Sequence, residues 1–516
     1  MALFAGGKPV HSVAGSGYLQ KLVAGLPADD SVKALTDITV GLDSVNRAEG
    51  LGLRRRFELI DLLDSTAQHH FHKLSDEYQS AQRLQQFEEN TLWTAAFDFS
   101  KRLSDAYSRC VEELASDGGA AVQVRKEIPV FVARGLRALT LQLKWTLLRY
   151  DPIDTNVWAA VGRLYLVSET RGICTESVRI YPDAHGQGTV QGEFLKAMML
   201  GVSSNNGLNP AQQEIAARAV AHFGGMYALR QEPGPGCNFW FDLSLPQPPA
   251  RAMKGFAPGN TMRCFGAGGA LAALAALVRE IQQNDRVPAG IDIGAGFDSD
   301  LVLSALQHLA LQWADEPPAR RSERRRIATR LTVLHGFPEM VRATESLTDA
   351  ASLDFEHAAG IESWMVVDVS EGGFGAIIPP VMGDWIKVGA LLGVQTDASP
   401  AWGAGMIRRI ERDDSRQRRV GIQLLAKTVI PVKLFPAGNG AADEAASAGE
   451  SALLLSTTPD KHGEVSLLVR AGSGMREHPL EMSVRGKRYH LAPRGLVESK
   501  DDFDWVRFKV TGRRAG

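Results

Sequence analysis

The stretch Arg320-Arg321-Ser322-Glu323-Arg324-Arg325-Arg326-Ile327-Ala328-Thr329-Arg330 marks the point where the hydrophobic pattern of this chain changes from helical to strand-like. The formal net charge of the whole protein is only -2, so the positive charge of this stretch is a local feature. A guanidinium group suits phosphate because its planar fork donates two parallel hydrogen bonds and keeps its charge. We therefore treat the stretch as a candidate anion-binding segment.

The sequence before this stretch is predicted to be mostly helical. Two long apolar stripes at helical spacing run from Phe99 to Leu114 and from Val132 to Leu147, and the second lies between Pro129 and Pro152. Further helices are predicted at 156–169, 191–201 and 210–223 and in two segments before Pro317, with a strand-like piece at 237–243. We expect a helical bundle region over 1–150 and a mostly helical second region over 151–316.

After the arginine stretch the hydrophobic period becomes two, which is typical of strands. Turn residues separate six short predicted strands, which indicates a small barrel over 317–436; the strands span 331–337, 364–370, 374–379, 385–395, 402–411 and 419–426. An Ala- and Gly-rich linker is expected over 437–450 and a β-rich tail over 451–516. The predicted fold class is a multidomain α+β protein.

The composition excludes several classes of protein. The chain has 516 residues and four cysteines without a CxxC pair, so two to four domains in a reducing compartment are expected. The start, Met1 to Gly7, has no basic segment followed by an apolar core, and no signal peptide is expected. The most apolar run, Gly266 to Val278, is shorter than a membrane span of about 20 residues. We expect a cytoplasmic protein that does not insert into a membrane.

A second motif, Asp368-Val369-Ser370-Glu371-Gly372-Gly373, follows one of the predicted strands. A carboxylate at Asp368 can accept a hydrogen bond from a guanine N–H, and the Ser370 hydroxyl can donate or accept. Gly372 and Gly373 permit tight turning and a close approach of backbone to ligand. Arginine pairs bidentately with the O6 and N7 atoms of guanine. Together the two motifs predict a site for a guanine nucleotide with few phosphates.

The pattern Arg325-Arg326-x-x-x-Arg330 before a strand, followed by Asp368-x-Ser370-x-x-Gly373, resembles the paired RxxxR and D/NxSxxG signature of PilZ domains. PilZ domains are bacterial receptors for cyclic di-GMP. Gly421-Ile422-Gln423-Leu424 on the sixth predicted strand also fits the barrel of that family. The resemblance covers only about residues 317–434, in the C-terminal part of the chain.

The resemblance implies a six-stranded antiparallel barrel that binds cyclic di-GMP on its outer surface. The arginine segment would be a loop that wraps the ligand and couples the barrel to its neighbouring domain. The implied contacts to phosphate and guanine edges come from Arg325, Arg326 and Arg330. The second motif completes the guanine site through Asp368, Ser370 and Gly373. Additional candidates are Arg324, Gly372 and Arg408.

The sequence departs from the PilZ pattern in three places. The segment between Arg330 and Asp368 is longer than usual, with 345–357 as a candidate insertion. The helix that commonly follows the barrel is not evident after Lys433. The helical N-terminal region differs from the β-barrel module that precedes the PilZ domain in flagellar-brake proteins. These departures bear on the output of the protein more than on its ligand.

Other motifs favour ordinary structural roles. Gly294-Ala295-Gly296 lacks the last glycine of a dinucleotide-binding fingerprint, since Ser299 stands there, and a helix N-terminus capped by Asp298 is the favoured interpretation. His69, His70 and His72 lack a second group of ligands, so a polar helix surface is expected rather than a metal site. No phosphate-binding P-loop or nucleophile elbow occurs. We therefore expect no catalytic residues, no metal and no cofactor other than the nucleotide ligand.

The leading hypothesis is a bacterial cyclic di-GMP effector of signal transduction, in motility or biofilm regulation, whose helical region binds a protein partner. One alternative is a scaffold or interaction protein whose PilZ-like barrel binds no nucleotide. A second alternative is a nucleic-acid-binding protein that uses the arginine run. The sequence disfavours it, because it lacks a broad basic face interleaved with aromatic residues.

Overall fold

The computed structural model describes residues 16–514 except 81–85, 117–121, 123, 183–186, 317–321, 347–359, 380–384, 398, 400, 414, 416, 438–448, 476–477 and 485. The chain forms two compact units, Met1–Pro318 and Ala319–Gly516. The linker expected over 437–450 lies almost wholly outside the described residues, and its last residue, Glu450, already begins a strand.

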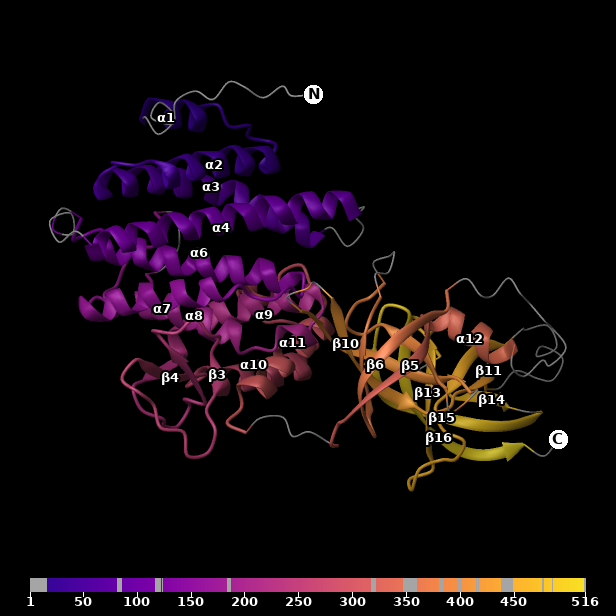
Figure 1. Ribbon diagram of the computed structural model, residues 1–516. Coiled ribbons are helices and arrows are strands. Elements are labelled where there is room, and N and C mark those ends of the chain that lie inside the picture. Colours follow the sequence, from indigo (N-terminus) through magenta and orange to yellow (C-terminus); the bar gives the residue numbers. More distant parts are fainter. Residues whose placement is uncertain are drawn as a thin grey trace. The chain divides into compact units, whose positions relative to one another are not determined.

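The first unit is a stack of long helices that pack across one another, coloured indigo to magenta in Figure 1. The two apolar stripes of the sequence become the buried faces of α4 and α6, as predicted. Buried aromatic side chains fill the space between the layers, among them Phe99 and Trp145. The helices of the stack are α1 (Ser16–Ala24), α2 (Ser31–Arg47), α3 (Leu53–Ser80), α4 (Gln86–Ser116), α6 (Ile128–Leu148), α7 (Thr155–Thr170), α8 (Val190–Gly201) and α9 (Pro210–His222).

A small sheet and two more helices complete the first unit. The sheet has the order β1-β4-β2-β3, and its strands span Ala228–Arg230, Phe239–Asp242, Ala250–Arg251 and Met262–Gly266 for β1 to β4. Helices α10 (Ala270–Asn284) and α11 (Ser299–Trp313) follow. One continuous apolar core extends from Leu19 to Trp313. The division expected at 150/151 therefore does not coincide with a break in the core, because α6 packs against both α4 and α8.

The second unit begins with the predicted six-stranded antiparallel barrel. Its strands are β5 (Arg325–His335), β6 (Glu362–Ser370), β7 (Gly373–Ile377), β8 (Leu391–Thr396), β9 (Gly403–Arg412) and β10 (Arg418–Ala426). They close in the order β5-β6-β7-β10-β9-β8. Alternate apolar residues such as Leu331, Trp364 and Val420 fill the interior. The structure therefore confirms the fold class that the period of two predicted.

Two details of this barrel differ from the sequence-based expectation. Strand β5 begins at Arg325, so the arginines lie on the strand and not in a loop before it, since Arg325 and Arg326 pair with Val369 and Asp368 of β6. A helix, α12 (Phe337–Ser346), follows β5 and covers part of the barrel, with Phe337 and Met340 buried. Most of the candidate insertion, residues 347–357, lies outside the described residues.

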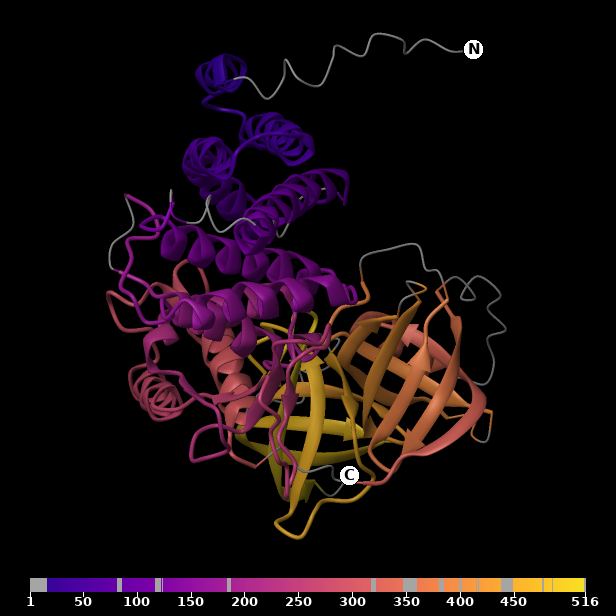
Figure 2. The same ribbon diagram turned by 60° about the vertical axis from the view of Figure 1, so that its left-hand side comes forward.

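The β-rich tail forms a second closed barrel, drawn in yellow beside the orange strands of the first barrel in Figure 2. Its strands are β11 (Ile430–Pro436), β12 (Glu450–Leu454), β13 (Glu464–Arg470), β14 (Leu480–Val484), β15 (Lys487–Ser499) and β16 (Phe503–Arg514). β11 pairs with β12 and β14. The first barrel therefore ends at Ala426 rather than near residue 436, and the second begins before the expected linker.

The two barrels share one strand order. The second closes as β11-β12-β13-β16-β15-β14, which is the order of the first when the strands of each barrel are counted along the chain. All pairings in both barrels are antiparallel. The second unit is therefore built from two copies of the same topology.

An apolar cluster joins the barrels. It combines Leu391 and Met406 of the first barrel, Phe337 of α12, and Leu453 and Phe503 of the second barrel. Polar contacts also join the barrels: the Phe337 backbone N–H donates to Asp502 at 2.9 Å, and Arg408 pairs with Glu498 at 2.6 Å. Burial of this seam makes the two barrels a single compact body. Within the described helices, none has the length and apolarity needed to cross a membrane.

Candidate functional site

The fold brings the two halves of the sequence motif together on neighbouring strands. Arg326 of β5 lies opposite Asp368 of β6, and Ser370 of β6 lies opposite Gly373 of β7. Residues directly opposite in an antiparallel pair project from the same face of the sheet. Since Leu331 and Trp364, which also lie opposite each other, fill the barrel interior, Arg330 and its partner Met365 lie on the outer face. The motif residues therefore meet on the outside of the barrel.

Three arginines on β5 have no counter-charge among the described residues. Arg325, Arg326 and Arg330 are exposed, and no carboxylate in the described part of the chain forms an ion pair with any of them. A register shift between Arg326 and Thr329 interrupts the pairing of β5 with β6 at this point. Such a bulge bends a strand and redirects its side chains. The result is a concentration of unpaired positive charge at the exposed start of β5.

The carboxylate of Asp368 is held in a tight environment. A Cβ atom built on Gly375, its partner on β7, would lie 2.5–2.8 Å from the three carboxylate atoms of Asp368. Only glycine at position 375 allows the carboxylate to lie across β7. Arg324 Nη1 lies 3.1 Å from Oδ1 and 3.4 Å from Oδ2 of Asp368, and it meets hydrogen-bond geometry only with Oδ2.

The Oδ1 atom of Asp368 is buried and accepts no hydrogen bond from any described residue. A buried polar atom without a partner costs free energy, and most such atoms in proteins have one. Exposed Arg324 supplies a charge nearby without satisfying this acceptor, since its side chain is 52% exposed against 25% for Asp368. Asp368 therefore offers a carboxylate oxygen that is ready to accept a hydrogen bond from a ligand N–H group.

The glycines of the second motif allow close contact between neighbouring strands. A Cβ on Gly373 would lie 1.9 Å from the Ile422 carbonyl oxygen, so the close approach at this position is to strand β10. The Gly372 carbonyl accepts a hydrogen bond from the Leu424 N–H at 2.8 Å. Ser370 Oγ donates to the Gly373 carbonyl over a long 3.5 Å, which leaves the hydroxyl weakly engaged.

Arg408 contacts the second barrel. Its two terminal nitrogens donate to the two carboxylate oxygens of Glu498 at 2.6 Å each, and its Nε donates to Gln423 at 2.6 Å. Burial opposes ionisation of Glu498, but the hydrogen bonds and charge of Arg408 outweigh it, so the pKa of this carboxyl is lowered. The Arg408 guanidinium is thus engaged in joining the barrels.

Other residues that the sequence singled out lie elsewhere. Asp298 occupies the N-cap position of α11, as expected, but its side chain makes no capping hydrogen bond. His70 is buried in α3, whereas His72 is exposed. Among the described residues there is no group of three or more His, Cys, Asp or Glu side chains arranged to hold a metal ion. Arg320 and Arg321 lie outside the described residues.

Three further residues shape the outer face, and the paired sequence motif contains none of them. Gly375 makes room for the Asp368 carboxylate, Gly421 lies opposite Gly375 on β10, and Arg409 lies opposite Gly421 on β9. The available signal was the alternation of Gly373 and Gly375, which places two glycines on one face of a strand. The contribution of Arg409 depends on strand register and has no local signal in the sequence.

The second unit matches a family model described as "Cyclic-di-GMP receptor FimW, middle PilZ domain" over residues 338–431. The first barrel is a PilZ domain. The matched residues include the second motif of this PilZ domain, Asp368 to Gly373, and end at the start of β11. The arginine segment lies just before the matched residues.

A second model, described as "Cyclic-di-GMP receptor FimW, N-terminal domain", matches residues 18–233. The similarity to this receptor family therefore extends to the helical unit, which corrects the expectation that the resemblance is confined to the C-terminal part. The two matches together span more than half of the chain. A comparison with curated proteins gave no match.

Proposed function

We propose that this protein is a cyclic di-GMP effector that binds the nucleotide on the outer face of its PilZ domain. The observation that supports this most strongly is the unsatisfied Asp368 Oδ1 opposite the unpaired Arg326. A guanine base presents N–H donors on one edge, and its phosphates are anionic. The face thus offers an acceptor and positive charge side by side. The similarity of the helical unit and the PilZ domain to a cyclic di-GMP receptor family supports the same ligand.

Each proposed contact follows from the chemistry of the side chain. Arg325, Arg326 and Arg330 bind phosphate oxygens and guanine edges through bidentate, charge-assisted hydrogen bonds. Asp368 accepts from a guanine N–H, and Ser370 is free to exchange its long internal hydrogen bond for one to the ligand. Arg324 moves from Asp368 toward the ligand phosphates. Because the Arg324 side chain is 52% exposed, water screens its pair with Asp368, and the rearrangement costs about 1 kcal/mol.

The position of the arginines in the chain supports a role in signalling. The two units meet at Pro318 and Ala319, only a few residues before Arg324. A nucleotide bound to Arg325, Arg326 and Arg330 restrains the start of β5, which lies close in sequence to the boundary between the two units. The ligand shifts the equilibrium between arrangements of the units only as far as it prefers one of them. In this proposal the protein is a binding effector rather than an enzyme, works in the cytoplasm and uses its helical unit to bind a protein partner.

Calorimetric titration of the full chain with cyclic di-GMP tests the proposal. We expect saturable binding by the wild type and a loss of at least about tenfold in affinity in Asp368→Asn, the scale of one charge-assisted hydrogen bond. Arg507→Ala on the outer face of the second barrel is the matched control and keeps wild-type affinity. Absence of binding by the wild type at high micromolar nucleotide would instead favour a scaffold protein with a non-binding PilZ domain.

A solution-scattering measurement with and without nucleotide tests the signalling step. If the ligand favours one arrangement of the two units, the radius of gyration of the full chain changes on saturation in the wild type and stays constant in Asp368→Asn. A wild-type curve that is unchanged at saturating nucleotide would remove the rearrangement from the proposal while leaving the binding site in place.

A further inference from the structure

The outer face of the PilZ domain has an opening beyond the sequence motif, over strand β10. The cross-strand row through Arg326 and Asp368 continues through Gly375 and Gly421 to Arg409. The carboxylate of Asp368 covers Gly375, but the space above Gly421 is open. The nearest atom to a Cβ built on Gly421 is the Cβ of Arg409, at 3.4 Å. This contact also shows that Arg409 projects from the same face as Gly421.

The opening has an acceptor on one side and a donor on the other. Asp368 Oδ1 lies over β7, Gly421 forms the floor on β10, and Arg409 borders the far side on β9. Adjacent strands lie about 4.8 Å apart, so the Asp368 carboxylate over β7 and the backbone of Arg409 on β9 are separated by about 10 Å across the sheet. That separation accommodates a flat heteroaromatic ring that hydrogen-bonds on both edges.

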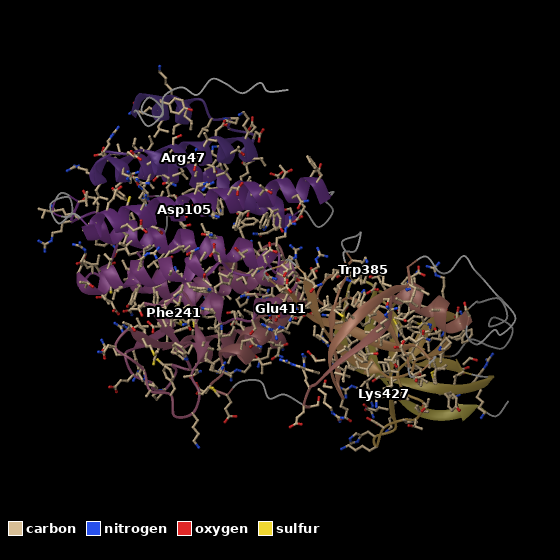
Figure 3. The ribbon with its side chains drawn as sticks, viewed as in Figure 1. Arg47, Asp105, Phe241, Trp385, Glu411 and Lys427 are labelled. Atoms are coloured by element: carbon tan, nitrogen blue, oxygen red, sulfur yellow. The ribbon has the colours of Figure 1, made fainter. Side chains whose placement is uncertain are left out.

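Arg409 is available for such a contact. Its side chain is 59% exposed and pairs with Glu411, which is itself 40% exposed and is labelled in Figure 3. Exposed pairs of this kind contribute little and rearrange readily. A bulge at Arg408 separates the two neighbouring arginines, so that Arg408 contacts Glu498 while Arg409 stays beside Gly421.

We propose that Gly421 and Arg409 complete the guanine subsite and determine its base specificity. This inference rests on the proposed function. The guanine ring lies flat on the Gly421 backbone, its N1–H and N2–H₂ donors face Asp368, and its O6 and N7 acceptors face the Arg409 fork. Adenine presents an amino group where guanine presents O6, and so places a donor toward the Arg409 donors. The pair Asp368 and Arg409 thus selects guanine over adenine from opposite edges of one ring.

Titration of the full chain with cyclic di-GMP and cyclic di-AMP tests this assignment. We expect Arg409→Ala to weaken cyclic di-GMP binding by about tenfold and to narrow the preference over cyclic di-AMP, as loss of a bidentate base contact does. Arg409→Lys keeps the charge without the fork and restores only part of the preference. Gly421→Ala raises the floor by one methyl group and weakens binding, and the larger Gly421→Val abolishes it.

The controls separate the possible outcomes. Gly421→Ala meets only Arg409 Cβ and should keep the fold, and Gly512→Ala on β16 is a matched strand glycine whose new Cβ would lie 3.7 Å from His490. If Asp368→Asn loses affinity while Arg409→Ala and Gly421→Ala bind both nucleotides like Gly512→Ala, the inference is overturned and the proposed function stands. If the wild type binds no nucleotide, the proposed function and this inference fail together.

Discussion

The two barrels of the C-terminal unit share their strand order, yet their polar groups are satisfied to different degrees. The hairpin formed by the second and third strands of each barrel shows the difference. In the first barrel Asp368 has a carboxylate oxygen without a hydrogen bond among the described residues. In the second barrel Asp460 accepts from the backbone N–H groups of His462 and Glu464 at 2.8 and 2.9 Å, which lowers the pKa of its carboxyl. One aspartate is left for a ligand and the other caps a turn.

The strands that open the two barrels differ in the same way. β5 begins with exposed arginines, whereas β11 begins at Ile430 after Lys427, Thr428 and Val429. Arg494 and Arg507 of the second barrel lie near Glu464, at 3.5 and 4.0 Å. Two barrels with the same topology therefore do not carry the same binding site. The binding face depends on which polar groups the fold leaves without partners.

The largest expected difference between the barrels is the loss of stability when the glycine after the turn between the second and third strands is replaced by alanine. Gly373→Ala forces a Cβ against the Ile422 carbonyl, and we expect it to destabilise the C-terminal unit by about 3 kcal/mol, since a backbone atom cannot move aside. Gly463 has a φ of 73° with open space around it, so Gly463→Ala should cost only about 1 kcal/mol. Denaturant unfolding of both variants measures the two costs. Equal costs would show that the two turns are under the same constraint.

The second expected effect concerns binding. Arg326→Ala and Arg330→Ala each remove a charged donor from the outer face of the PilZ domain, and we expect losses of about 1.5–3 kcal/mol in cyclic di-GMP affinity, about 10- to 150-fold. Arg507→Ala removes an exposed arginine from the second barrel and should change nothing. Calorimetric titration of the three variants decides, and unchanged affinity in both first-barrel variants would remove the site assignment.

The contact between the barrels should have a smaller effect. Glu498→Gln breaks the bidentate pair with Arg408, and we expect a loss of about 1 kcal/mol in the stability of the C-terminal unit, because Arg408 is 37% exposed and water screens the pair. Because the folded pKa of Glu498 is lowered, its contribution is present above the unfolded value near 4.5 and is lost as the pH falls through the folded pKa. Thermal unfolding from pH 7 to pH 3 should converge for wild type and Glu498→Gln. If the melting temperatures of the two proteins fell in parallel with pH, the Glu498 carboxyl would not be responsible for the pH dependence of stability.

The smallest expected effect is that of Arg324. Its ion pair with Asp368 competes with the ligand, whereas its charge attracts the phosphates, so the two contributions oppose each other. We expect Arg324→Ala to change cyclic di-GMP affinity by less than about 1 kcal/mol. Titration of this variant beside Arg326→Ala checks the ranking. A loss as large as that of Arg326→Ala would place Arg324 among the principal ligand contacts.

The sequence predicted the first barrel well because its strands alternate in hydrophobicity. Trp364, Val366 and Ile422 fall on the buried face where the period of two places them. The strand ends were less accurate: the strand predicted over 385–395 is β8, which begins only at Leu391, and Trp385 lies in a turn where its ring stacks on Trp364 (Figure 3). A large aromatic residue has high strand propensity, but here tertiary packing decides its conformation.

The second barrel and half of the binding face could not be predicted in this way. β11 contains Pro431 and is followed by a long Ala- and Gly-rich segment, so it resembled the end of one domain rather than the start of another. Choosing between Arg408 and Arg409 required knowledge of a bulge that shifts the register after Ile407. Asp368 and Arg326 were found because a short motif contains them. Gly421 and Arg409 come from strands far along the chain, and only long-range pairing brings them to the site.

Hydrogen–deuterium exchange of the full chain with and without saturating cyclic di-GMP compares the two barrels most directly. The account predicts slower exchange on binding in 324–330, 365–377 and 405–423 of the first barrel, with no change at the corresponding turn of the second barrel, residues 455–463. Equal protection of both barrels, or protection confined to the second, would contradict the central claim that unsatisfied groups on the first barrel alone form the nucleotide site.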